Sequence, residues 1–487
     1  MVSAPTALAA PCAVPTDPLW RSHGAGDGGA GGDRRNPYGG HRRPCEAIVR
    51  PPAALKGELG GHYHGRFVAT SSPQSLKGMH DLLPPASDRW SDLIARFGAH
   101  VGLAGYRLVK TPILEDLAVF ARLGEGTDIV TKEMYEFADR DGTRIALRPE
   151  STAGVARALI QHHPTMPWRV WYASEHFRHE NTQAGRYRQH HQLGAECFGP
   201  SDPDVDVELI VALWDFYRSL GLKRIRLELN SIGDPRSRTE YHERLTDFLR
   251  ACADRLDPDD RKKIDSHPIR VLDSKRPVTI EALAGAPTML DAMTPEALAH
   301  FERVRQGLTA AAVPFVMNAR LVRGLDYYTH TVFEVVSEAI DAAQSTIGGG
   351  GRYDGLVEAM GGTPTPGFGF GTGIERVLLA CDAEGAFSPQ ARTSDVFVVA
   401  FGGDSADVRD LCLELRRSGV MTERAFDGRS GRAQMKLADR SGARIGLILG
   451  DDERAGGTVT LRDLRGDVGQ VSVARSTIVD EVRKRLL

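Results

Sequence analysis

The sequence predicts an α+β fold, in which an antiparallel sheet with a helical insertion is followed by a smaller α/β domain. Strand-like segments succeed one another between residues 106 and 233, and several are separated only by short turns, which favours antiparallel pairing. Residues 234–312 show amphipathic helical patterns and are predicted to be the insertion. Beyond residue 394, strand and helix patterns alternate, as in small α/β domains.

Composition bounds the class of protein. The chain has 487 residues and a formal net charge of −3, which argues against a generally basic nucleic-acid binder but leaves room for local basic patches. Its six cysteines lie far apart without a C-x-x-C pair, so we expect no disulfide framework, no zinc site and a cytoplasmic location. No run of about 18 apolar residues occurs, so we expect no membrane association.

The first part of the chain, residues 1–74, is rich in Gly, Pro, Ala, Arg and His and has no periodicity. We expect a disordered extension, or an artefact of an upstream start codon, because such a segment buries too little apolar surface to order itself. The first residues do not resemble a secretory signal, since no basic residue precedes Arg21. A basic arm that contacts RNA is the alternative, because four arginines cluster there: Arg34, Arg35, Arg42 and Arg43.

Ordered patterning begins near residue 75. Ser87 or Asp88 is predicted to cap a helix whose apolar residues recur every three or four positions. Strand patterns then lead to the insertion and return after it, ending in the glycine-rich segment "GFGFGTGIERV", where a strand runs into a helix. A break near "FSPQARTSD" gives the predicted domains, 75–388 and 394–487.

The segment "HQLGAECFG" predicts a strand with one polar face. Alternation places Leu193, Ala195 and Cys197 on a core face, and Gln192, Gly194 and Glu196 on the other face. An amide, an empty space and a carboxylate in a row suggest a pocket for a small polar molecule. The same argument puts four residues of "YYTHTVFE" on one face: Tyr328, His330, Val332 and Glu334.

Acidic and basic residues lie in segments on both sides of this strand in the sequence. Glu150 precedes a predicted helix start, and two roles fit that position: capping of the helix, or binding of a protonated amine. "FRHENTQAGRYRQHHQ" places Arg178, Arg186 and Arg188 on two predicted strands joined by a turn, which fits either a solvated edge strand or a polyphosphate site. His190 and His191 face opposite sides of a strand, so a two-histidine metal site is not expected.

Several of these segments, in this order, resemble the histidyl-tRNA synthetase family of class II aminoacyl-tRNA synthetases. The resemblance covers residues 76–487. "RGLDYYT" and "GGRYDGL" are specific to that family and its near relatives, whereas "FRHE" and "GxGxER" are class-wide. The other matching motifs are "KGMHDLLP", "LRPESTAGVAR", "GRYRQHHQLGAECFG", "LNSIGDP" and "RVLDSKRP".

The resemblance implies a class II catalytic core at 75–388, with its antiparallel sheet and helical insertion, and an anticodon-binding domain at 394–487. It implies a histidine–tRNA ligase that uses ATP and Mg²⁺ to form histidyl-adenylate and then charges tRNA(His). It also implies a homodimer. In the last domain we expect Arg429, Arg432 and Lys436 to contact RNA, although an ordinary charged helix face is the alternative.

Residue roles follow from the same resemblance. Arg178, Arg323 and Arg376 are expected to be catalytic, with Arg323 near the α-phosphate and the histidine carboxylate. For histidine, the implied residues are Glu150, Thr152, Gln192, Glu196, Tyr327 and Tyr328. For ATP they are Arg178, Glu180, Arg186, His190 and Arg376, with Glu180 as a Mg²⁺ ligand.

Two departures from the family pattern affect these expectations. Asn181 and Thr182 stand where many members have Arg-Pro, which concerns the approach of the tRNA acceptor end, and His190 stands where adenine often stacks on phenylalanine. The alternative function is non-catalytic histidine sensing, as in a relative of this family, the histidine-sensing subunit of ATP phosphoribosyltransferase. Those relatives lack the C-terminal domain and parts of the motifs that this chain keeps.

Overall fold

The computed structural model describes residues 72–121, 132–272, 274–321, 327–340, 345–388, 393–402, 405–426, 428–466 and 469–487. The chain divides into two units, Met1–Ser72 and Pro73–Leu487, and the description below concerns the second. Residues 1–71 of the predicted N-terminal extension, with their four clustered arginines, lie outside the described residues, and so does Arg323.

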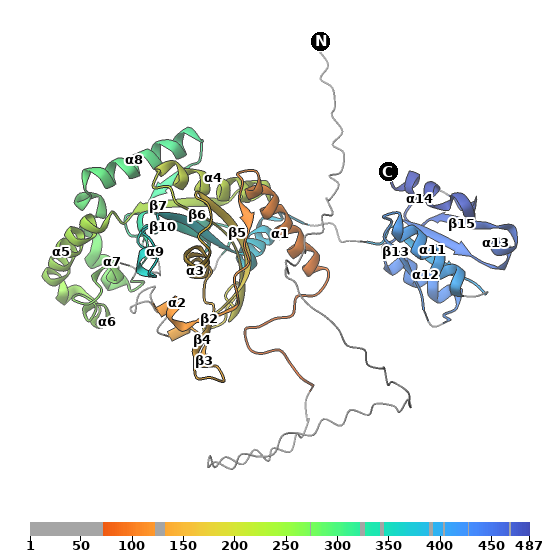
Figure 1. Ribbon diagram of the computed structural model, residues 1–487, viewed down its shortest axis with the longest axis horizontal. Helices are drawn as coiled ribbons and strands as arrows, with labels where there is room; N and C mark the ends of the chain where they lie inside the picture. The colour runs from red at the N-terminus through yellow and green to blue at the C-terminus, as the bar shows by residue number, and fades with distance from the viewer. Residues whose placement is uncertain are drawn as a thin grey trace, which may run out of the picture. The chain divides into compact units, whose positions relative to one another are not determined.

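The largest sheet among the described residues has eight strands (Figure 1), and it is called the central sheet below. Neighbouring strands are antiparallel except for the outermost pairs, β1 with β5 and β7 with β8, which are parallel. The predicted antiparallel sheet is confirmed. In spatial order the strands are β1 (Arg107–Leu108), β5 (Trp168–Phe177), β6 (Gln189–Phe198), β11 (Gly367–Gly373), β10 (Thr346–Arg352), β9 (Thr329–Ser337), β7 (Ile225–Ser231) and β8 (Phe315–Met317).

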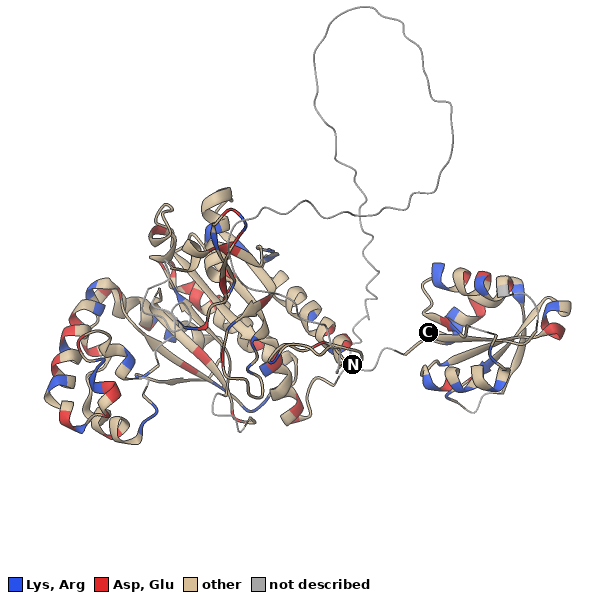
Figure 2. Ribbon diagram, turned by 90° about the horizontal axis from the view of Figure 1, so that it is seen from below, with Lys and Arg blue, Asp and Glu red and all other residues tan. Residues whose placement is uncertain are grey.

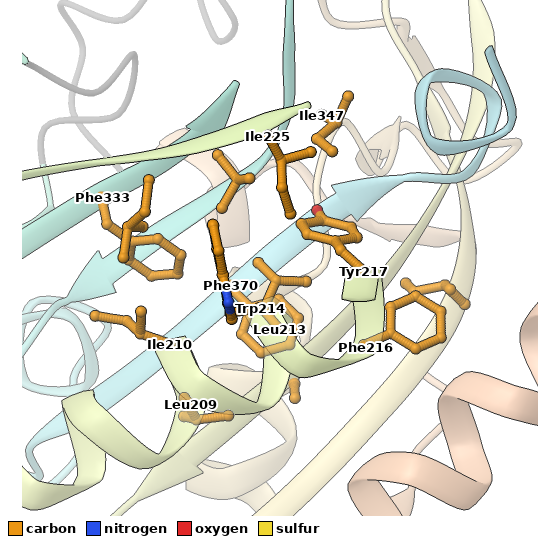
Figure 3. Close-up of a cluster of buried hydrophobic side chains, with 14 of the residues drawn as sticks. Leu209, Ile210, Leu213, Trp214, Phe216, Tyr217, Ile225, Phe333, Ile347 and Phe370 are labelled. Atoms are coloured by element: carbon orange, nitrogen blue, oxygen red, sulfur yellow. The ribbon is translucent and has the colours of Figure 1, made fainter. Parts of the chain in front are cut away.

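One face of this sheet is apolar and is covered by helices. Leu193, Ala195 and Cys197 of β6 are buried in this core, as alternation predicts. Figure 3 shows side chains of α4 packing toward Phe333 and Phe370 of the sheet. The helices that contribute to this core are α1 (Ala86–Gly102), α4 (Pro203–Ser219), α8 (Pro295–Ala310) and α10 (Ile374–Glu384).

The other face carries a smaller apolar cluster and the polar residues of the site. Its apolar cluster joins side chains of the sheet, such as Val170 and Val332, to those of α3 (Thr152–His162) and α9 (Leu356–Ala359). A small antiparallel sheet packs nearby, with Phe120 and Ala146 buried in the same cluster. This sheet and its helix consist of β2 (Leu114–Asp116), α2 (Leu117–Ala121), β3 (Glu136–Ala138) and β4 (Arg144–Leu147).

The insertion contains α5 (Pro235–Ala251), α6 (Pro258–Arg261) and α7 (Pro277–Ala282), joined by short 3-10 turns. These helices have a core of their own, which includes Tyr241 and Leu249. Helix α8, predicted as part of the insertion, packs instead into the core of the central sheet. Figure 2 shows acidic and basic residues interspersed along the insertion helices.

The C-terminal part is a five-stranded mixed sheet with helices on both faces, which confirms the predicted α/β domain. Strands β13, β12 and β14 are parallel, and β15 and β16 continue the sheet antiparallel. On α12, Arg432 and Lys436 are exposed, as is Arg429 just before it, while Ala438 is buried. The strands are β12 (Val396–Ala400), β13 (Thr422–Arg424), β14 (Ile445–Leu449), β15 (Thr458–Asp463) and β16 (Val471–Ala474), and the helices are α11 (Ser405–Arg417), α12 (Gly431–Arg440), α13 (Asp451–Gly456) and α14 (Ile478–Leu486).

Two local features bear on the predictions. Helix α1 begins at Ala86 and no side chain caps it, so Ser87 and Asp88 lie inside its first turn rather than before it. None of the helices in the described ranges has the length and apolarity that crossing a bilayer requires.

Candidate active site

Strand β6 presents its polar face to a row of glycines on β11. Glu196 pairs with Gly369 and Gln192 pairs with Gly373 across these two strands. A Cβ atom on Gly369 would overlap the Glu196 carboxylate, and one on Gly371 would lie 2.9 Å from the Gln192 amide oxygen. The alternating glycines of "GFGFGTG" therefore make room for the polar side chains of β6.

The space beside Gly194 is already occupied. Gly194 pairs with Tyr172 of β5, and a Cβ atom on Gly194 would overlap the end of the Tyr172 ring. The prediction that Gly194 leaves room for a small molecule is therefore wrong, because the tyrosine of the neighbouring strand fills that position. The hydroxyl of Tyr172 instead donates to Glu196, at 3.4 Å.

Glu196 is buried and surrounded by hydroxyl groups. The Thr152 hydroxyl donates to one carboxylate oxygen at 2.8 Å, and the Tyr353 hydroxyl donates to the other. Burial raises the pKa of Glu196 to about 8, even though these hydrogen bonds favour the charged form. A carboxyl group poised near neutral pH within a ring of hydroxyls can exchange hydrogen bonds with a ligand that carries ring nitrogens.

Glu150 lies at the start of α3. Its carboxylate accepts hydrogen bonds from the backbone N–H groups of Thr152, at 2.7 Å, and Ala153, at 2.8 Å. Glu150 thus caps the first turn of α3, as one of the two explanations predicts, and Ser151 makes no cap with its own side chain. Burial raises the pKa of Glu150, against the opposing effect of these bonds and of the Arg178 charge. A protonated amine of a ligand would neutralise the negative charge of the buried Glu150 carboxylate.

Tyr327 and Tyr328 stand beside the carboxylates. Their ring centroids lie 4.6 Å apart, and the ring of Tyr353 lies 5.8 Å from Tyr327 and 6.4 Å from Tyr328. His330, predicted on the same face as Tyr328, departs from it. Its φ of +48° interrupts the alternation, and its ring stacks on His300 of α8, at 4.8 Å, on the helix-covered side of the sheet.

Three arginines line a cavity of about 730 Å³ next to this cluster, and the cavity also includes His190, Gln192 and Tyr328. Arg178 follows β5, Arg186 lies in the connection to β6, and Arg376 lies on α10. Arg178, Arg186 and Arg188 were predicted on two strands joined by a turn, but all three lie in the connection, because β5 ends at Phe177 and β6 begins at Gln189.

The arginines are held by main-chain oxygens. Arg178 donates to the Pro149 carbonyl at 2.9 Å, and Arg376 donates to the Gly185 and Thr346 carbonyls at 3.1 and 2.8 Å. Burial lowers the pKa of Arg376, and the charges of Arg186 and Arg178 lower it further. Three mutually repelling guanidinium groups at one cavity favour an anionic ligand with several oxygens.

Glu180 and His190 complete this side of the cavity. The buried Glu180 carboxylate lies against the Arg186 guanidinium and 3.9 Å from that of Arg178. Burial lowers the pKa of His190 well below its usual value, and Arg178 acts in the same direction, so its ring is neutral. Its edge-on neighbour His176, at 5.5 Å, binds the Ser151 hydroxyl at 2.7 Å.

His191 points away from His190, as predicted from alternation. Its ring pairs with Glu375, at 2.9 Å, and packs edge-on against Trp90 of α1, at 4.7 Å. Within the described ranges, no group of three or more His, Cys, Asp or Glu side chains could hold a metal ion.

Sequence reasoning missed Tyr172, His176 and Tyr353. Tyr172 and His176 alternate along β5 toward the same face as the polar residues of β6, so the register of that hairpin would have found them. Tyr353 stands in the quoted motif "GGRYDGL", but nothing local to that motif indicates its bond to Glu196, which lies far away in the sequence.

A buried ion pair lies on the helix-covered side of the sheet. Arg352, at the end of β10, and Asp206, on α4, are both fully buried and hydrogen bonded to each other. Arg352 also donates to Asp354, at 3.1 Å, and to the carbonyls of Pro200 and Asp202. His300 binds the second oxygen of Asp206 at 3.0 Å.

Comparisons with known proteins agree with this geometry. Residues 78–377 match the family model described as histidyl-tRNA synthetase, and residues 395–485 match that of an anticodon binding domain. The histidine–tRNA ligase of Nocardia farcinica is 46% identical over 427 residues, which cover 86% of this chain and 100% of that protein. The ligase of Rhodococcus erythropolis is 45% identical over 412 residues, covering 83% and 96%. The apo S. aureus histidyl-tRNA synthetase structure superposes with a TM-score of 0.72 at 32% identity, covering 85% of this chain and 100% of that one.

Proposed function

This chain belongs to the histidyl-tRNA synthetase family, and on that premise we propose which of its residues carry the reaction. It is a histidine–tRNA ligase, which activates L-histidine with ATP and transfers the histidyl group to tRNA(His). The observation that carries the assignment is the placement of three arginines at one cavity beside the buried Glu196 cluster.

Histidine binds in the carboxylate and hydroxyl cluster. Glu150, Thr152 and Gln192 bind its α-amino group, and Glu196 and Tyr328 bind the two imidazole nitrogens, with Tyr327 packed beside them. The support for this is that Thr152 bridges the two acidic sites, since its N–H binds Glu150 and its hydroxyl binds Glu196. A ligand without ring nitrogens makes no hydrogen bond to Glu196 or Tyr328, and each buried polar group that it leaves without a partner costs roughly 1–3 kcal/mol.

ATP binds along the arginines. Arg178 binds the α-phosphate, Arg376 the γ-phosphate with Arg186 beside it, and His190 packs against adenine. A histidine carboxylate oxygen attacks the α-phosphorus, the bond from this phosphorus to the β-phosphate oxygen breaks, and pyrophosphate leaves. Fixed guanidinium groups stabilise the charge that develops on the phosphate oxygens, so no protein nucleophile is required. Arg323, the third catalytic arginine we propose, lies outside the described residues.

Glu180 would hold a magnesium ion together with phosphate oxygens of the nucleotide. Mg²⁺ typically takes one or two carboxylates plus phosphate oxygens and water. The buried Glu180 carboxylate at the arginine cavity fits that donor set. When bound, the ion adds positive charge at the phosphates.

Transfer follows at the same site. A ribose hydroxyl of the terminal adenosine of tRNA attacks the histidyl carbonyl carbon, and AMP leaves with the bonding electron pair. The anticodon is bound by the domain at 394–487, and its exposed residues Arg429, Arg432 and Lys436 support an RNA-contacting surface. The core is the domain at 75–388, which includes the insertion.

We also propose a cytoplasmic homodimer. The family resemblance supports the dimer, which light scattering on the purified chain tests by its mass. Free, buried thiols at Cys197, Cys252, Cys381 and Cys412 support a reducing compartment.

The test of the function is histidine-dependent exchange between ATP and pyrophosphate, measured with each of the twenty amino acids. We expect exchange with histidine alone, followed by charging of tRNA(His). Arg323→Ala should abolish exchange and leave histidine binding, measured by calorimetry, mostly intact. Histidine binding without exchange in the unmodified chain would instead indicate the histidine-sensing subunit.

A further inference from the structure

We propose that a second basic group in the active-site cavity, formed by Lys275 and Arg320, binds the phosphate backbone at the 3′ end of tRNA. This group would serve transfer of the histidyl group and not its activation. The inference rests on the proposed function, because it assumes that the adenylate forms beside Arg178 and Arg376.

The cavity extends well beyond the three arginines. It is lined by Gly371 and Gly373 of β11 and also by Glu228 of β7. These two strands are three positions apart in the sheet, which corresponds to about 14 Å at the usual strand spacing. At the β7 end, the lining residues come from the insertion and from the segment after β8, and they include Lys275, Ile280 and Arg320.

The loop that carries Lys275 is fixed by a buried carboxylate. Asp260 is fully buried and accepts hydrogen bonds from the hydroxyls of Ser274, at 2.5 Å, and Thr279, at 2.9 Å, and from the Arg276 guanidinium, at 2.7 Å. The motif "RVLDSKRP" is thus held on both sides of Lys275. Lys275 and Arg276 are neighbours in this motif. Arg276 is bound to Asp260, and Lys275 lines the cavity.

The segment that carries Arg320 is tied to the sheet. The backbone N–H of Arg320 donates to the Asn318 side chain at 3.1 Å, and Asn318 donates to Glu228 at 2.6 Å. Glu228 also pairs with Arg226 at 2.8 Å, so its charge is compensated within the sheet. The guanidinium of Arg320 makes a 3.4 Å bond to the Leu283 carbonyl of the insertion.

The chemistry of the reaction indicates what this group binds. The triphosphate has three arginines on the other side of the cavity, whereas the incoming tRNA must bring a ribose hydroxyl, and the phosphodiester before it, into the same space. Lysine and arginine bind such phosphates and position the strand. Ile280 is 40% exposed and lines the same cavity. It offers an apolar surface for a ribose or a base beside Lys275 and Arg320.

The experiment separates the two steps. Lys275→Ala and Arg320→Ala are compared with Lys262→Ala, a control on the same insertion whose side chain is 76% exposed and paired with Asp259. Activation is measured by pyrophosphate exchange, and transfer by single-turnover reaction of preformed histidyl-adenylate with tRNA(His). We expect exchange within about 2-fold of the unmodified chain for all three, and transfer slowed about 10-fold or more only for Lys275→Ala and Arg320→Ala.

Two outcomes would overturn the inference. A raised KM for ATP in exchange would show that Lys275 and Arg320 bind the nucleotide. Unchanged transfer would show that these two residues only pack the insertion against β8.

Two further results are expected. Lys275→Arg should restore transfer. In the alanine variants, the dependence of transfer on salt should weaken by about 0.7 in the log–log slope for each lost phosphate contact. Absence of exchange in the unmodified chain would remove the proposed function itself.

Discussion

Two clusters of arginine charge lie on opposite faces of the central sheet, one buried and one half-buried, and they differ in what neutralises them. Arg352 binds two carboxylates and two carbonyls, and although burial acts against it, Asp206 raises the pKa of Arg352. Arg376 donates to carbonyl oxygens and faces Arg178 and Arg186, and its pKa is lowered. The first, the Arg352 cluster, is neutralised by two carboxylates and serves the structure. In the second, the Arg376 cluster, three guanidinium groups face one another, and the Glu180 carboxylate lies beside two of them.

The largest effect on stability is expected from a substitution in the Arg352 cluster. Asp206→Ala removes the buried carboxylate partner of Arg352 and leaves only the half-buried Asp354, which should lower the free energy of unfolding by about 3–5 kcal/mol, measured by urea denaturation. Asp204→Ala is the control, since its pair with Arg303 is exposed on both sides and should contribute less than about 1 kcal/mol. A similar loss for both variants would contradict the distinction.

Removing an arginine of the Arg376 cluster should affect activity more than stability. Arg376→Ala should reduce pyrophosphate exchange by on the order of 10²–10³-fold, because a charge aimed at the phosphates is lost. Its free energy of unfolding should stay the same or rise, because repulsion with Arg186 and Arg178 is relieved. Exchange and urea denaturation on the same preparation check both parts, and a loss of stability like that of Asp206→Ala would show that the two clusters are alike.

Glu196 adds a third case to the comparison of the two arginine clusters. Its buried carboxylate is neutralised by binding a proton. Its pKa in the folded chain is about 8, above the usual 4.5, so the folded state binds more protons than the unfolded state between these values. Stability should therefore fall as pH rises through this window, by at most about 1.4 kcal/mol per pH unit. Glu196→Gln should remove this part of the decline and weaken histidine binding. Unfolding curves from pH 4.5 to 8 test it, and an unchanged decline in the variant would assign the slope to other groups.

Local patterns predicted one side of the site and missed what completes it. Alternation placed Gln192 and Glu196 on one face of β6, because side-chain direction in a strand is a local property. It could not show that Tyr172 occupies the space beside Gly194, since this depends on the register between β5 and β6. His330 left its predicted face because its positive φ interrupts the alternation, which no neighbouring residue signals. The fold class was predictable from element order, whereas the contact of Tyr353 with Glu196 joins distant segments.

The pairing of β6 with β11 has a consequence for synthesis on the ribosome. Strand β6 ends at Phe198, and its partner begins at Gly367, roughly 170 residues later. At a translation rate of about 5–20 residues per second, the edge of β6 that pairs with β11 stays unpaired for roughly 10–30 s after it is made. An unpaired strand edge is a template for association with other chains. The nascent chain thus passes through an aggregation-sensitive interval before the last strands of the core emerge, and chaperone occupancy should be greatest in that interval.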